Sequence, residues 1–269
     1  SEVFYDFGEE LHDEKLWGKP HPASDSPRFM EIGNSVFMSY RKTEAGVIDL
    51  PSKNIDFGGG LERIAAAALN SHDVFKISLL WPIIGKLEEL SGKKYEQNTG
   101  AMRVIADHLR GAVFLAVDGV TPSNKEQGYV MRRLTRRAIR FAFELGVEQD
   151  FLAELTVVVA GLYKDDYPEV AKKEKEIIDI LTREERIFRQ TLRKGLRELE
   201  KRAGGGLSGK EIFELYDTYG FPRELVLEEA FKRDIKVGKT WQNDFDEEMK
   251  KQRERSQTAT KGVFKGGLA

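Results

Sequence analysis

The hydrophobic pattern of this 269-residue chain changes its period near residue 60. Residues 29–40 alternate apolar and polar side chains, which is typical of a β-strand, and both Asn34 and Val36 fall on the apolar face. From Leu61 onward the apolar residues recur at helical spacing instead. The chain is therefore expected to have an α+β fold, in which a short antiparallel sheet is followed by a mostly helical part.

The helical part is divided by turn signals. A first apolar stripe contains Leu61, Ile64, Ala65, Ala68 and Leu69. The glycine run at 203–209 ends the longest helix, because glycine caps helices and is unfavourable inside them. Further helices are expected over 76–91, 100–116, 127–145, 150–163, 168–202 and 241–255. One face of the helix over 168–202 is marked by apolar residues that include Ile177, Phe188 and Leu199, and the apolar side of the helix over 127–145 includes Met131, Ala138 and Leu145. The polar, glycine-rich tail 256–269 is predicted to be a linker.

Composition narrows the class of protein. With 40% hydrophobic and 33% charged residues, no cysteine and no apolar run longer than about six residues, the chain resembles a soluble, cytoplasmic protein rather than a membrane or disulfide-rich one. It begins without Met and ends in mid-pattern, so we expect a piece of a longer protein. The net charge of −2 conceals an excess of bases in residues 101–140, eight against three acids, which indicates a polyanionic partner.

The stretch NIDFGGGLERIAAAA, residues 54–68, joins the last strand to the first helix. The simplest interpretation is a left-handed glycine turn, with Asp56 in a turn or cap. The alternative is an anion site, because glycines admit a ligand to the backbone and a helix start offers free N–H groups. Arg63 lies opposite the apolar stripe and is available to a phosphate, and Asp56 is available to an ammonium group.

A second cluster is formed by five arginines between residues 132 and 140, which fall within an arc of about 140° at helical spacing. These arginines are Arg132, Arg133, Arg136, Arg137 and Arg140. A solvated charged face is one interpretation. Because no acidic residue stands at i±4 within 132–140, phosphate contact is the favoured one, giving affinity without sequence preference.

Several motifs together resemble one family. DFGGGLER resembles motif 3 of class II aminoacyl-tRNA synthetases, and EIGNSVFMSY with IDFGGGLERI resembles the alanyl-tRNA synthetases in particular. SEVFYDFG at 1–8, the segment 103–140, LYDTYGFP at 215–222 and the closing FKGGLA agree with that family in the same order. Two departures, Gly33 where many members have Trp and DFGGG in place of DTGMG, leave the shape of the alanine pocket open.

The resemblance implies a division of the chain and a set of site residues. Residues 1–75 correspond to the end of the adenylation domain with motif 3, 76–255 to a helical tRNA-recognition domain, and 256–269 to a linker toward an absent editing domain. By resemblance Asn34, Val36, Asp56 and Gly58 bind alanine and Arg63 binds ATP. Asn124 and Asp217 match the residues that recognise a G·U wobble pair in the acceptor stem of tRNA(Ala); a turn residue and a helix cap are their simpler interpretations.

The same resemblance implies limits. The family uses ATP with magnesium as a substrate, and its editing-site metal ligands are His and Cys, whereas this chain has four unclustered histidines and no cysteine, so neither a metal site nor a catalytic side chain is expected. Motifs 1 and 2 are missing. We therefore expect a monomeric piece, without a membrane partner, that does not activate alanine by itself. The alternatives are a non-catalytic tRNA-binding module of synthetase ancestry and a helical scaffold with incidental charge.

Overall fold

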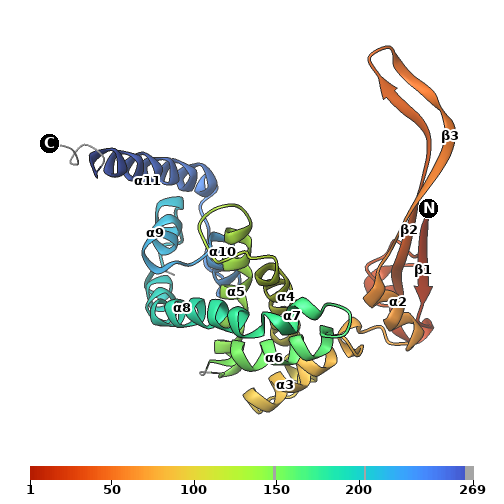
Figure 1. Ribbon diagram of the computed structural model, residues 1–269, viewed down its shortest axis with the longest axis horizontal. Helices are drawn as coiled ribbons and strands as arrows, with labels where there is room; N and C mark the ends of the chain where they lie inside the picture. Colours follow the sequence, from red (N-terminus) through yellow and green to blue (C-terminus); the bar gives the residue numbers. More distant parts are fainter. Residues whose placement is uncertain (148–149, 203, 264–269) are drawn as a thin grey trace. The chain divides into compact units, whose positions relative to one another are not determined.

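The computed structural model describes residues 1–147, 150–202 and 204–263. The chain divides into two compact units, Ser1–Gly85 and Lys86–Ala269, which are described separately. The division falls inside helix α3 (Trp81–Ser91), further along the chain than the boundary expected after residue 75. The predicted α+β class is confirmed, because three antiparallel strands precede a series of helices (Figure 1).

The first unit is built on a three-stranded antiparallel sheet in the order β1-β2-β3. Its strands are β1 (Glu2–Asp6), β2 (Phe29–Thr43) and β3 (Gly46–Gly59). Strands β2 and β3 form a long hairpin that extends beyond β1 (Figure 1). The alternation predicted for residues 29–40 is confirmed as far as Met38, after which the pairing register shifts. Short helices η1 (Glu9–Leu11), α1 (Glu14–Trp17), α2 (Leu61–Ala68) and η2 (Val74–Lys76) complete the unit.

Helix α2 buries a different face from the predicted one. Ala66 and Ala67 are buried, whereas Leu61, Ile64 and Leu69 are each at least 44% exposed. The expectation that the stripe of large apolar residues faces a core is therefore wrong. The reason is that α2 packs mainly on β2 and η2, which leaves its large apolar residues without a second layer in the described part of the chain.

The second unit is helical and continues from α3. Its remaining elements are η3 (Tyr95–Gln97), α4 (Thr99–Val117), α5 (Glu126–Leu145), α6 (Phe151–Tyr163), α7 (Pro168–Lys172), α8 (Glu174–Arg202), α9 (Gly209–Tyr219), α10 (Arg223–Lys232) and α11 (Trp241–Val263). Three of the six predicted helices, 100–116, 127–145 and 150–163, are confirmed within two residues of their ends.

Three predicted helices differ from the observed ones. The helix expected over 76–91 begins only at Trp81, and the one expected over 168–202 is divided at Lys173 into α7 and α8. The helix expected over 241–255 continues to Val263. The first half of the predicted linker is therefore helical, and residues 264–269 lie outside the described part of the chain.

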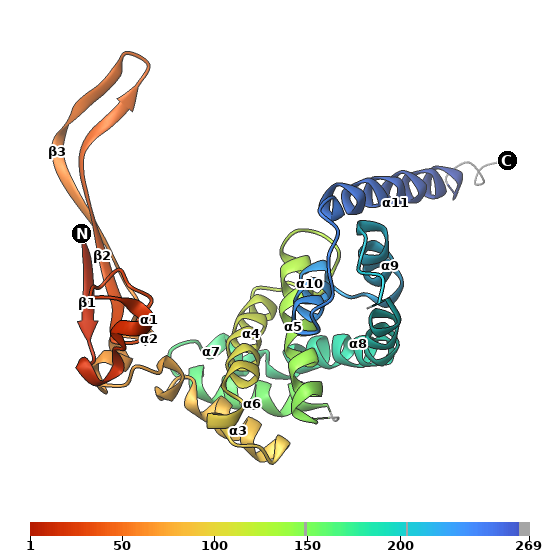
Figure 2. The same cartoon turned by 180° about the vertical axis from the view of Figure 1, so that it is seen from behind.

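Helix α5 runs through the middle of the second unit, beside α4 and crossed by α8 (Figure 2). Its predicted apolar side is buried, as Met131, Ala138 and Leu145 illustrate. The predicted face of α8 is buried from end to end and includes Ile177, Phe188 and Leu199. Because α5 also buries much of its other side, it can hold side chains from several helices in fixed positions.

Candidate functional sites

The five arginines of α5 do not form one exposed basic face, the arrangement that both interpretations of the sequence require. The side chains of Arg136 and Arg140 are each only 8% exposed. Arg136 Nε lies 2.6 Å from Glu184 Oε1 of α8, and Arg140 Nη2 donates to Glu229 Oε2 of α10 at 2.8 Å. The prediction is wrong for these two residues, because the acidic partners come from helices distant in the sequence.

The other three arginines are also paired with glutamates of α8 and α10. Arg137 donates to both carboxylate oxygens of Glu228, at 2.8 and 3.0 Å. Two ion pairs are looser. Arg132 lies 3.7 Å from Glu184, and Arg133 lies 3.5 Å from Glu224. Arg132 and Arg133 keep 24% and 39% of their side chains exposed. Arg137 keeps 34% exposed, but its guanidinium is bidentate with Glu228, so Arg132 and Arg133 are the exposed arginines with the loosest ion pairs.

Arg136 connects three parts of the second unit. Burial lowers its pKa, and the carboxylate of Glu184 opposes that shift. Its Nη1 donates to the carbonyl oxygen of Gly220, and its guanidinium lies 5.0 Å from the ring centroid of Phe188 in α8. Since a buried unpaired guanidinium is strongly destabilising, these contacts fix the turn after α9 against α5 and α8.

The segment LYDTYGFP ends α9 by a glycine C-cap. Gly220 has a left-handed backbone (φ 66°), which glycine adopts without strain. The backbone N–H groups of Gly220 and Phe221 both donate back to Leu215 O, the latter at 3.2 Å, and the Phe221 ring is 1% exposed. Pro222 then starts α10. This turn leaves Asp217 exposed on the last turn of α9, and the helix-cap interpretation of Asp217 does not apply.

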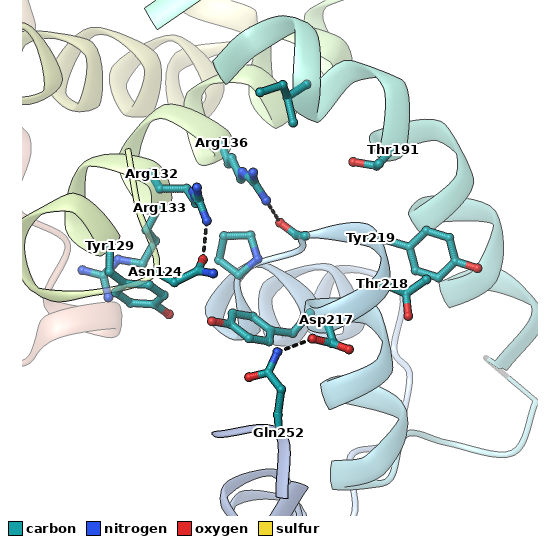
Figure 3. Close-up of a pocket in the computed structure, with 14 residues that line it drawn as sticks. Asn124, Tyr129, Arg132, Arg133, Arg136, Thr191, Asp217, Thr218, Tyr219 and Gln252 are labelled. Carbon is teal, nitrogen blue, oxygen red and sulfur yellow. Dashed lines mark hydrogen bonds between the residues drawn. The ribbon is translucent and has the colours of Figure 1, made fainter. Parts of the chain in front are cut away.

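A pocket of about 260 Å³ lies where α5, α8, α9 and α11 meet (Figure 3). It is lined by both predicted reader residues, Asn124 from the loop before α5 and Asp217 from α9. Three of the predicted arginines, Arg132, Arg133 and Arg136, also line it. Residues 93 positions apart in the sequence (217 − 124) are thus brought to one cavity. Arg137 and Arg140 are not among its lining residues.

The two reader residues each have one hydrogen-bond partner in the pocket (Figure 3). Arg132 Nη1 donates to Asn124 Oδ1, and Gln252 Nε2 of α11 donates to Asp217 Oδ1. Arg132 also donates to the carbonyl oxygen of Pro122 at 3.4 Å. Gln252 was not singled out by the sequence, because it stands in an acidic helix without a motif and is more than thirty residues from Asp217.

Tyr129 is a further lining residue that the sequence analysis missed. Its hydroxyl donates to Glu224 Oε2 at 3.2 Å. Burial, together with the adjacent carboxylate of Glu224, raises the pKa of Tyr129 to about 12. The phenol is therefore a neutral hydrogen-bonding group at physiological pH.

The predicted alanine residues form two cross-strand pairs in the first unit. Asn34 is paired with Gly58, and Val36 with Asp56, across β2 and β3. Directly opposed residues of an antiparallel pair share a face, so all four side-chain positions lie together. Asp56 has no hydrogen bond or ion pair within the described residues and is exposed. A carboxylate beside small and branched neighbours is suited to a ligand that carries both an ammonium group and a small side chain.

Arg63 lies at the start of α2, as predicted. Its Nη1 donates to Glu31 O of β2 at 3.0 Å and lies 3.9 Å from Glu31 Oε2. The Arg63 side chain is 54% exposed, so an anion from solvent has access to it. The carboxylate of Glu31 also accepts from Asn34 Nδ2 at 3.5 Å, which connects the arginine to the paired residues.

The two departures from the family pattern lie against each other. A β-carbon added to Gly33 would stand 2.7 Å from Cζ of Phe57, so the ring covers the glycine from the next strand. Gly33 is paired with Gly59, which places this contact on the opposite face of the sheet from Asn34 and Asp56. The aromatic ring therefore replaces side-chain volume that Gly33 lacks.

No group of three or more His, Cys, Asp or Glu side chains in residues 1–147, 150–202 and 204–263 is placed to hold a metal ion. In the same residues no helix has both the length and the apolar character needed to cross a membrane.

Comparison with known proteins defines the class of protein. The chain matches the family model described as tRNA synthetases class II (A) over residues 1–266, and it belongs to that family. Among curated relatives it is 40% identical over 274 residues to an alanine–tRNA ligase of Bacillus velezensis, an alignment that covers 98% of this chain and 31% of that protein.

Two further alanine–tRNA ligases show the same level of similarity. The one from Shouchella clausii is 40% identical, with 96% of this chain and 30% of that protein covered. The one from Hydrogenovibrio crunogenus is also 40% identical, with 97% and 30% covered. The chain thus spans about a third of the length of the curated relatives it matches.

Proposed function

We propose that this chain is part of an alanine–tRNA ligase, carrying half of the alanine and ATP site in its sheet and the acceptor-stem recognition pocket in its helices. In the complete reaction the alanine carboxylate attacks the α-phosphorus of ATP, supplied with magnesium, and pyrophosphate leaves. The terminal hydroxyl of tRNA(Ala) then attacks the alanyl carbonyl, and AMP leaves. No side chain of this piece acts as a nucleophile; the residues bind and orient the reactants.

In the sheet each residue has a separate role in this proposal. Asp56 pairs with the α-ammonium group of alanine, and Val36, directly opposite on β2, limits the size of the side chain that fits. Asn34 and Gly58 complete the floor of the site, where glycine leaves space for the ligand. Arg63, half exposed at the start of α2, binds a phosphate of ATP.

The observation that carries the proposal for RNA is that Asn124 and Asp217 line the same pocket. Both side chains are exposed and polar, and they stand at the mouth of a cavity bordered by Arg132 and Arg133. A wide, shallow A-form minor groove presents base edges to groups arranged in this way. We assign the two residues to recognition of a G·U wobble pair in the acceptor stem.

The roles of the five arginines are revised by their burial. Arg132 and Arg133 are assigned to the RNA backbone, together with Lys125 and Arg253, which line an adjoining hollow of about 680 Å³. Arg136 and Arg140, whose side chains are each 8% exposed, are assigned to holding α8, α9 and α10 in place around α5. Arg137 is assigned with them because it donates to both carboxylate oxygens of Glu228. Neutralising Arg133, Lys125 or Arg253 should weaken the binding of all RNA duplexes alike.

A non-catalytic tRNA-binding module is the second candidate. It is favoured by the exposure of the sheet, where Val36 is 54% exposed and Asp56 has no protein partner in the described residues. Pyrophosphate exchange separates the two candidates when it is measured on the complete protein of which this chain is part, because only an enzyme with a complete adenylation site exchanges pyrophosphate into ATP in the presence of alanine. We expect no exchange by this chain alone; measurable exchange would show that it holds a working site.

The proposed RNA function is tested by direct binding. Two acceptor-stem duplexes that differ only in a G·U or a G·C pair are titrated at about 50 mM and about 200 mM salt. We expect tighter binding of the wobble duplex by roughly 10-fold or more at both salt concentrations, and weaker binding of both at high salt. Asp217→Ala should remove the preference and leave the salt dependence unchanged. Equal binding of the two duplexes by the unsubstituted chain would refute the assignment.

A further inference from the structure

We propose that Arg132 and Gln252 are positioning residues that fix the hydrogen-bonding polarity of Asn124 and Asp217, so that the pocket offers one amide donor and one carboxylate acceptor to the RNA. This inference rests on the proposed function of the pocket. It concerns residues that do not need to touch the RNA base, and it names Gln252 of α11 as a determinant of specificity.

The contact with Arg132 determines the orientation of the Asn124 amide. A guanidinium has only N–H donors, so the atom of Asn124 that faces it must be the acceptor Oδ1. The Nδ2 group of Asn124 then points away from Arg132 and has no hydrogen bond to the described part of the chain. Asn124 therefore presents a donor. Without Arg132 the amide could turn by 180° and present an acceptor instead.

The orientation of Arg132 is itself restrained. Its Nη2 donates to Pro122 O, two residues before Asn124, and its Nε lies 3.7 Å from the buried carboxylate of Glu184. Glu184 is held in turn by Arg136, at 2.6 Å. The loop that carries Asn124 is thus tied to the core of the unit through one side chain.

The contact with Gln252 determines which oxygen of Asp217 is available. An ionised carboxylate only accepts, so Gln252 must present its Nε2 donor, and it does so to Oδ1. Oδ2 has no hydrogen bond to a described residue and stays available as an acceptor. Gln252 is half-buried whereas Asp217 is exposed, so of the two hydrogen-bonded side chains Asp217 is the one more accessible from solvent (Figure 3).

Helix α11 is held in the position that this contact requires. Near its start the ring of Phe245 packs on α9, at 5.9 Å from the ring centroid of Phe213 and 5.6 Å from that of Tyr216. Gln252 stands seven residues after Phe245, which is two helical turns, and so it lies on the same face of α11. Tyr216 is the chain neighbour of Asp217. The aromatic contact therefore aligns Gln252 with Asp217.

One donor beside one acceptor suits a G·U wobble pair. In this pair the guanine 2-amino group makes no bond to uracil, so both of its hydrogens face the minor groove and can meet Asp217 Oδ2. In a Watson–Crick G·C pair the cytosine O2 takes one of them. Asn124 Nδ2 can donate to a neighbouring acceptor of the groove, such as a base O2 or a ribose oxygen. Because Arg132 fixes the Asn124 amide, the pocket does not present an amide oxygen to the groove in place of this donor.

The test uses three duplexes that carry G·U, G·C or inosine·U at one position, inosine being guanine without the 2-amino group. The affinity ratio of the G·U to the inosine·U duplex measures recognition of the amino group. We expect a ratio of about 10 or more for the unsubstituted chain. Gln252→Leu should lower this ratio several-fold, to about 3, with little change in affinity for inosine·U. Gln252→Lys keeps a donor and should restore the ratio.

Controls separate the possible causes. Gln242→Leu changes an exposed glutamine of the same helix that makes no bond to Asp217 and should leave the ratio unchanged. Arg132→Met should lower discrimination, and Arg132→Lys should retain most of it. A Gln252→Leu variant with an undiminished ratio would overturn this inference while the pocket assignment stands. A ratio near 1 in the unsubstituted chain would overturn both.

Discussion

The backbone of Gly195 in helix α8 lies directly against the ring of Phe221, the residue that follows the glycine cap of α9. A β-carbon at Gly195 would stand 2.4 Å from Phe221 Cε2, closer than non-bonded carbon atoms approach. The ring is 1% exposed and packs on Phe188 at 5.5 Å between centroids. A glycine inside a helix is normally unfavourable, and here it provides the space that the Phe221 side chain fills.

Replacing this glycine should therefore destabilise the protein, although alanine is the better helix former. We expect Gly195→Ala to lower the free energy of unfolding by about 1–3 kcal/mol, because the ring has no free volume into which to move. Gly161→Ala, in α6, is the matched control: nothing lies within 4 Å of its β-carbon position. That variant should gain about 0.5–1 kcal/mol. Urea unfolding followed by far-UV circular dichroism measures both; equal effects would contradict the packing argument.

Glu184 is expected to be more important for stability than other acidic residues of α8. It is 4% exposed and is the carboxylate shared by Arg132 and Arg136. Glu184→Leu would leave the guanidinium of Arg136 buried without its partner and should cost about 3–5 kcal/mol. Glu198→Leu, which removes pairs with Lys201 and Arg202 in the same helix, should change stability much less, because Glu198 is 25% exposed and Arg202 also pairs with Glu214. Thermal unfolding of the two variants gives the comparison. If the unpaired guanidinium is the cause, the double variant Glu184→Leu/Arg136→Met should regain part of the stability that Glu184→Leu loses.

Ionisation of Tyr129 should be displaced to high pH. Its pKa is raised to about 12 by burial and by Glu224, above the ordinary value of 10.0. The sign follows from linkage: the folded state favours the protonated phenol, so its contribution to stability is complete below about pH 10 and is lost as pH rises through about 12. Difference titration of phenolate absorbance, unsubstituted chain minus Tyr129→Phe, isolates this residue among eight tyrosines. A midpoint near 10 would contradict the prediction.

The start of α9 should weaken in acid. Ser208 and Glu211 form a capping box, and the backbone N–H of Ser208 is the main cause that holds the pKa of Glu211 below 4.5. Its contribution to stability is therefore present above the unfolded value and is lost as pH falls through the lowered folded value. Ser208→Ala should cost about 1 kcal/mol near neutral pH. The stability difference between the unsubstituted chain and Glu211→Gln, measured by urea unfolding, should be present at about pH 7 and vanish at about pH 3.

Much of the fold follows from local rules. Alternation identified the strand that carries Asn34 and Val36, and helical spacing identified the buried face of α8. The end of α8 at Arg202 was also readable, because the glycine-rich run at 203–209 ends the helix. The prediction that failed is the burial of the apolar stripe of α2, whose large residues are exposed. An apolar stripe is buried only where another element packs against it, and the helical pattern does not say whether such an element is present.

The candidate pocket shows the same limit more clearly. The sequence determined that five arginines share one region of α5 and that Asn124 and Asp217 are polar residues beside turns. Only the tertiary structure decided that Glu184 and Glu229 form ion pairs with two of those arginines in the interior, and that Gln252 donates a hydrogen bond to Asp217. The physical reason is range: helix and strand periods arise between residues a few positions apart, whereas an ion pair or a hydrogen bond depends on the distance between atoms that the whole fold brings together.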